Sequence, residues 1–91
     1  MSKLRYVILD VLKPHEPSIY ELANEISKLS PSFTVNIKSI ERDEHTETIQ
    51  IMIQGDNINL EAVRKKINAL GATIHSIDKV CVGKKLVKVQ E

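Results

Sequence analysis

The feature that most constrains the fold is the apolar segment over residues 4–15, which reads Leu-Arg-Tyr-Val-Ile-Leu-Asp-Val-Leu-Lys-Pro-His. It is the longest apolar run in the chain, it carries several β-branched residues, and Pro14 stops it. Such a run is typical of a strand that is buried on both faces. We therefore expect a central strand with the rest of the chain folded around it. Asp10 is the exception, because it places a carboxylate inside this strand.

Two helices are predicted from their capping residues and their apolar spacing. Ser18 and Glu21 form a capping box for a helix over about residues 19–29. Asn59 caps a second helix, and Gly71 supplies the left-handed position that ends it. Each helix should bury one face, because apolar residues recur at helical spacing in both: Ile19, Leu22, Ala23, Ile26 and Leu29 in the first, and Leu60, Val63, Ile67 and Leu70 in the second.

The remaining strands follow from alternating apolar and polar residues. Residues 33–38 and 48–54 alternate in this way, and a polar stretch over residues 41–47 joins them as a β-hairpin. The last strand runs from Thr73 to about Val82, and its alternation slips near Ile77-Asp78, which predicts a bulge. We expect a single domain over residues 1–91, in which residues 84–91 add a short edge strand or fray.

The order β-α-β-β-α-β predicts a ferredoxin-like α+β sandwich. This fold has a four-stranded antiparallel sheet with two helices on one face, and its first and third strands lie side by side in the middle.

Composition argues against several classes of function. A net charge of +1 and only 3% aromatic residues argue against binding of nucleic acid through backbone phosphates or stacked bases. No apolar run reaches the roughly 20 residues that cross a bilayer, no signal peptide is evident, and the lone Cys81 excludes an intrachain disulfide. These features predict a cytoplasmic protein. There is no Gly-rich phosphate loop, His-Glu-x-x-His or Gly-x-Ser-x-Gly motif, so we expect no enzyme activity.

The sheet face that no helix covers is the first candidate site. Alternation along the first and third strands sends one set of side chains to the helices and the other set to this open face. An apolar patch is expected there, formed by Tyr6, Ile8, Leu12, Ile40 and Met52. Such patches mark partner surfaces, and another copy of the chain is the expected partner. Asp10 lies on the same face, where it forms an ion pair or contacts a ligand.

A second candidate site depends on strand direction. If the first and third strands run parallel, as we expect, one edge of the sheet gathers the start of each helix together with Lys13, His15, Glu16, Asp56, Asn57 and His75. Helix N-termini favour an anion, whereas histidines with carboxylates favour a divalent metal. The alternative is that these residues only cap helices and fill loops.

The acidic hairpin is the third candidate site. Glu41, Asp43, Glu44 and Glu47 are possible oxygen ligands for calcium, although the spacing is not that of an EF-hand. A solvated turn with ion pairs to Arg5 or Lys3 is the alternative.

Two blocks, Leu-Asp-Val-Leu-Lys-Pro-His at residues 9–15 and Ile-His-Ser-Ile-Asp-Lys-Val at residues 74–80, resemble an archaeal family, domain of unknown function 211. Shorter matches lie between them, at Val35-Asn36-Ile37, Asp43, Thr46-Glu47 and Ile53-Gln54-Gly55. The resemblance implies a ferredoxin-like fold, ring-like homo-oligomers, an archaeal cytosolic setting and bound metal ions, without an established activity. It also implies a ligand site formed by Asp10, Lys13, His15, His75 and Asp78.

The chain departs from the family in three places. Ser-Pro-Ser-Phe-Thr at residues 30–34 replaces a glycine-containing segment, Arg42 replaces an apolar residue, and Lys79 replaces an acid. The last two changes weaken a cation site at the hairpin.

Together these observations predict a non-enzymatic, self-assembling module with a divalent cation, calcium or a transition metal, or a small ligand at its subunit contacts. The candidate metal ligands are His15, Glu16, Asp43, Glu47 and His75. The alternative function is a regulatory domain that senses a small anion near Lys13, His15 and His75. Nucleic-acid binding ranks below both.

Overall fold

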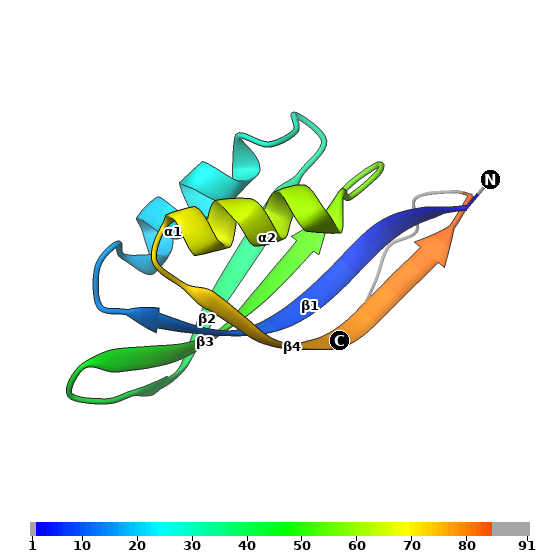
Figure 1. The fold of residues 1–91 in the computed structure, drawn as a ribbon. Coiled ribbons are helices and arrows are strands. Elements are labelled where there is room, and N and C mark those ends of the chain that lie inside the picture. Colours follow the sequence, from blue (N-terminus) through cyan, green and yellow to red (C-terminus); the bar gives the residue numbers. More distant parts are fainter. Residues whose placement is uncertain (1, 85–91) are drawn as a thin grey trace.

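The computed structural model describes residues 2–84. Its elements in chain order are β1 (Lys3–Pro14), α1 (Ile19–Ser27), β2 (Thr34–Arg42), β3 (Thr46–Gln54), α2 (Leu60–Ala69) and β4 (Thr73–Gly83). The strands form one antiparallel sheet in the order β2-β3-β1-β4, and both helices lie on one face of it (Figure 1). The predicted ferredoxin-like fold is confirmed. Beyond Lys84, the extra strand expected near the C-terminus lies outside the described residues.

The helix boundaries agree with the capping residues. Ser18 and Glu21 form the predicted capping box, with each side chain hydrogen-bonded to the backbone of the other residue. Asn59 caps α2, and Gly71 adopts a φ of 87° just past its end, a conformation that glycine tolerates because it has no Cβ. α1 ends at Ser27, two residues earlier than predicted. Neither helix in the described part of the chain is long and apolar enough to cross a membrane.

The prediction that β1 and β3 run parallel is wrong, because they pair antiparallel. The crossover through α1 makes β1 and β2 parallel, and β3, which turns back from β2, is inserted between them and opposes both. The end of β1 therefore meets the β2–β3 hairpin, with Lys13 opposite Glu47, and the start of β1 meets the loop after β3. This difference changes which polar residues share an edge of the sheet.

Arg5 shows what lies at the start of β1. Its guanidinium donates to the backbone carbonyls of Gly83, Lys84 and Asp56, and it pairs with the Asp56 carboxylate at 3.2 Å. Arg5 thus holds the end of β4 to the loop after β3. Asp56 forms its ion pair with Arg5 and does not lie beside Lys13, where it is expected from the sequence. The β2–β3 hairpin, which was expected near Arg5, lies at the opposite end of β1.

The core fills the space between the sheet and the helices. β1 contributes Val7, Leu9 and Val11, and β3 contributes Ile49, Ile51 and Ile53, as the alternation predicts. α1 and α2 pack onto these strands through Leu22, Ile26, Val63 and Ile67. All of these side chains are fully buried, which makes burial of this apolar surface the main source of stability.

β4 carries the irregularity that its sequence predicts. Its register against β1 shifts between Ile8 and Leu9, which leaves Asp78 as an extra residue, and again between Asp10 and Val11, which leaves His75 as a second one. Bulges re-aim side chains, and both residues belong to the ligand set implied by the resemblance. The second half of β4 and the start of β1 extend past the helices as a two-stranded ribbon (Figure 1).

The open face is less exposed than predicted. Tyr6 and Ile8 are buried, so their expected exposure is wrong. Their cross-strand neighbours include Met52, Gln54 and Lys79, whose long side chains flank them, and the Lys79 ammonium lies 5.7 Å from the centre of the Tyr6 ring. Met52 is half-buried, whereas Leu12 and Ile40 remain 45% and 53% exposed.

Candidate functional site

A buried ion-pair cluster lies where the end of β1 meets the hairpin. Lys13 is 1% exposed and Glu47 is 6% exposed, although both side chains are charged. They are cross-strand partners, and alternation places them on the same face as Val11 and Ile49, at the end of the core. The Lys13 ammonium donates to the carbonyls of Pro14 at 2.7 Å and His15 at 3.2 Å, and it lies 3.5 Å from a Glu47 oxygen. Its donors are therefore satisfied within the fold.

His15 joins this cluster through both of its ring nitrogens. Nδ1 lies 2.9 Å from Glu47 Oε2, and Nε2 lies 2.9 Å from the backbone oxygen of Glu44 in the hairpin turn. The hydrogen bond with Glu47 raises the pKa of His15 above its ordinary value of 6.5, and the Glu44 carbonyl raises it further, whereas desolvation and Arg42 oppose them. These contacts favour the doubly protonated imidazolium.

Glu47 is the common partner of the cluster. The hydrogen bond from His15 holds the pKa of the Glu47 carboxyl below its usual value, and the charges of Lys13 and Arg42 act in the same direction. Desolvation acts against them, but the resulting shift is downward. Arg42 lies 3.6 Å from the same carboxylate and is exposed, so Glu47 stays ionised among three cationic groups.

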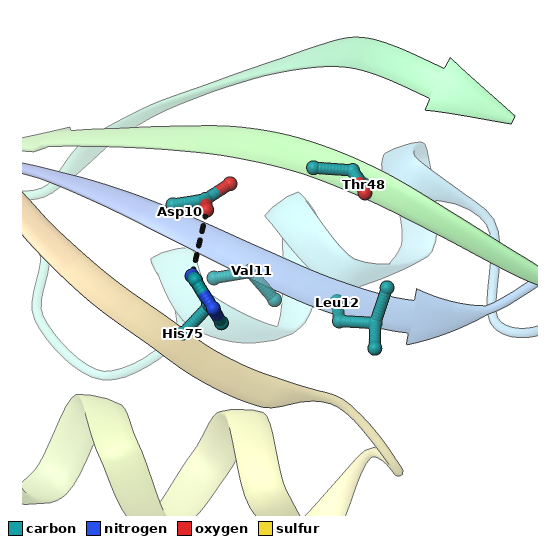
Figure 2. Close-up of a pocket in the computed structure, with 5 residues that line it drawn as sticks. All are labelled: Asp10, Val11, Leu12, Thr48 and His75. Atoms are coloured by element: carbon teal, nitrogen blue, oxygen red, sulfur yellow. Dashed lines mark hydrogen bonds and ion pairs between the residues drawn. The ribbon is translucent and has the colours of Figure 1, made fainter.

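A second polar pair lies on the open face of the sheet. His75 Nδ1 is 3.2 Å from Asp10 Oδ2, and the two side chains point toward one another across β1 and β4 (Figure 2). They line a shallow cavity of about 270 Å³ together with Val11, Leu12 and Thr48. Asp78, which the resemblance groups with them, instead accepts a hydrogen bond from Ser76 at 2.7 Å.

The residues predicted to bind a ligand thus divide into two groups. Lys13 and His15 contact Glu47 on the helix side, whereas Asp10 and His75 contact each other on the open face. Reasoning from the sequence missed the Lys13–Glu47 pair. The signal was available, because Lys13 continues the inward alternation of Val7, Leu9 and Val11, but the sequence-based prediction groups Lys13 with the helix N-termini as a ligand-binding residue.

Of the five predicted metal ligands, His15 and Glu47 contact each other, whereas the whole set does not gather at one point. Glu16 lines a small cavity with His15 and Glu47, Asp43 is exposed in the turn, and His75 lies on the other face. Residues 2–84 contain no group of three or more His, Cys, Asp or Glu side chains placed to hold a metal ion. Both nitrogens of His15 are already hydrogen-bonded, so we assign this cluster as an ion-pair network and identify none of its members as a metal ligand.

The fold and its polar pairs define a small ferredoxin-like domain in which no catalytic motif was recognised. A family model described as DUF211, Uncharacterized ArCR, matches residues 5–91, and the chain belongs to this family, as its two blocks predict. The Uncharacterized protein MJ0319 of the archaeon Methanocaldococcus jannaschii is 42% identical over 88 residues, which cover 97% of this chain and 91% of that relative. The family and this relative carry no named activity.

Proposed function

We propose that this protein is a non-enzymatic module that assembles with copies of itself through its sheet. One observation supports this proposal most directly. Among residues 2–84, every large apolar side chain left exposed belongs to the sheet, apart from Tyr20 on α1: Leu12, Ile40, Ile77, Val80 and Val82. Single exposed apolar residues are normal, and it is their concentration on the sheet that supports an interaction surface there.

Four of these exposed side chains lie in two regions. Leu12 is on the open face, and Ile40 occupies the register shift in β2. Val80 and Val82 are opposite Val7 and Leu4 on β1, in the part of β4 that extends past the helices (Figure 1). A self-complementary partner is favoured because most soluble oligomers are built from identical chains, and because a domain of this size gains stability by burying more surface.

The test places a charge at an exposed position on the sheet and compares it with a charge elsewhere. Leu12→Asp should shift the full chain to smaller species in size-exclusion chromatography with light scattering, because an unpaired carboxylate is costly at an apolar contact. Tyr20→Asp is the matched control, since Tyr20 is exposed on α1, and it should leave the mass unchanged. An unmodified chain that is monomeric at every concentration would refute the proposal.

The cavity beside Asp10 supports a second function, the binding of a small ligand. Lys13 is fully buried, so an anion site shared by Lys13, His15 and His75 has little support. The cavity instead presents the carboxylate of Asp10, the imidazole of His75 and the hydroxyl of Thr48 beside the apolar Leu12. These groups suit a small molecule that donates hydrogen bonds, such as a primary amine.

This alternative is tested by melting temperature. A ligand that binds only the folded chain raises the melting temperature through linkage, and Asp10→Asn should remove that rise. A panel of small amines and alcohols that leaves the melting temperature of the unmodified chain unchanged would eliminate this alternative, while self-assembly would stand.

A further inference from the structure

We infer that His15 is a proton-operated latch that fastens the β2–β3 turn to the end of β1. This device is independent of self-assembly and of the cavity beside Asp10. It depends on the position of one imidazole between two acceptors that belong to different parts of the chain.

The contacts of His15 fix its protonation state. The Glu44 backbone oxygen only accepts hydrogen bonds, and so does an ionised Glu47 carboxylate. Both lie 2.9 Å from a ring nitrogen of His15, so both nitrogens must carry a proton for both hydrogen bonds to form. A neutral imidazole has one proton, and either tautomer would leave a nitrogen lone pair facing an acceptor oxygen. Loss of the second proton therefore opens one side of the latch.

The latch ties the exposed turn to a region that the sheet already holds, because Lys13 is paired with Glu47 and Pro14 with Thr46 at the base of the turn. His15 lies in the link between β1 and α1, Glu44 is in the exposed turn, and Glu47 is the second residue of β3. The turn itself is closed by a hydrogen bond from the Asp43 amide to the Thr46 carbonyl at 2.8 Å. Among the side-chain hydrogen bonds of residues 2–84, the Nε2 contact with Glu44 is the one that ties this turn to the β1–α1 link, so the turn is the part that should respond to the proton.

Charged groups from each neighbouring element act on this proton. Glu47 on β3 favours the imidazolium, and Arg42 on β2 opposes it. Lys13 on β1 is buried against the same carboxylate, and Glu16 lines the adjoining cavity with His15. In the turn, the Glu44 carboxylate lies 3.6 Å from the exposed imidazole of His45 and is separate from the carbonyl that His15 contacts. The short contacts to Glu47 and Glu44 outweigh the opposing charge of Arg42.

The direction of the response follows from linkage. A histidine whose pKa is raised in the latched state stabilises that state fully below about pH 6.5, and this contribution is lost as the pH rises through the raised pKa. Each unit by which the pKa of the latched state exceeds that of the open state changes the opening equilibrium by about tenfold. The turn should therefore be held in mildly acidic solution and released in alkaline solution.

The experiment follows the proton and the turn together in the full chain. An NMR titration of the three histidine rings, with His15 identified by the signal that His15→Gln removes, should give His15 a pKa above 6.5. Amide hydrogen exchange at residues 43–46, corrected for its intrinsic pH dependence, should lose protection over the same pH interval. In His15→Gln this pH dependence should disappear.

Two further variants keep the test decisive. His45→Gln removes the histidine in the turn itself, and it should leave the pH dependence of the turn intact. Glu47→Gln should lower the pKa of His15, and if this variant does not fold, the comparison of His15→Gln with His45→Gln still stands. A His15 pKa at or below 6.5, or turn protection that changes with pH in the same way without His15, would overturn the inference.

Discussion

The two faces of the sheet carry the same pair of groups with different consequences. On each face, a histidine Nδ1 contacts a carboxylate, at 2.9 Å for His15–Glu47 and at 3.2 Å for His75–Asp10. The Glu47 carboxylate is buried on the helix side among Lys13 and Arg42, and the His15 side chain is 32% exposed. The His75 side chain is 77% exposed beside an open cavity.

This difference shows that the surroundings of a polar pair decide its role more than its composition does. On the helix side, further hydrogen bonds hold the His15–Glu47 pair, which gives this pair a structural role. On the open face the second nitrogen of His75 has no hydrogen-bond partner within residues 2–84. Three predictions test this contrast.

The largest effect is expected from Lys13→Ala. This change leaves the Glu47 carboxylate without its buried ammonium partner, and breaking a buried pair in this way costs about 3 kcal/mol. Lys79→Ala is the matched control, because Lys79 is an exposed lysine over the Tyr6 ring, and it should cost less than about 1 kcal/mol. Urea unfolding at a fixed protomer concentration measures both, and equal losses would contradict the contrast between the faces.

A smaller effect, visible only as a function of pH, is expected from His15→Gln. The unmodified chain should lose its advantage in melting temperature over this variant as the pH rises through the raised pKa of His15. Glu47 has a lowered pKa, so its contribution is present above its ordinary value of 4.5 and is lost as the pH falls through the lowered pKa. The difference in melting temperature between the unmodified chain and His15→Gln should therefore be largest at pH values between the ordinary pKa of Glu47 and the raised pKa of His15. A difference that is constant with pH would be evidence against the ion-pair network.

The smallest effect on stability is expected from His75→Gln. Because this side chain is exposed and makes one hydrogen bond within residues 2–84, the free energy of unfolding should change by about 0.5 kcal/mol or less. Its effect should appear instead in ligand binding or in the mass of the assembly. A loss of stability as large as that of Lys13→Ala would show that His75 also has a structural role.

The fold could be predicted from the sequence because local signals agreed with one another. The capping box at Ser18, the left-handed position at Gly71 and the alternation of β3 each specify an element, and their order specifies the topology. The bulge in β4 was also visible, because the alternation slips near Asp78.

The candidate site was harder to predict because it depends on strand direction and on the burial of charges. Assigning β1 and β3 as parallel grouped Lys13 with Asp56, whereas the antiparallel register places it opposite Glu47. The burial of Tyr6 and Ile8 depends on the flanking side chains of neighbouring strands, which alternation within one strand does not show. Pairing between strands was therefore the missing information in both cases.

Native mass spectrometry of the full chain, purified without chelator and then treated with EDTA, tests self-assembly most directly. The exposed apolar side chains of the sheet predict a single defined oligomer that persists after EDTA, because apolar contacts hold it together. An oligomer that retains ions and dissociates in EDTA would show that a shared metal, and not apolar contact, causes assembly. A monomer under both conditions would contradict the proposed function itself.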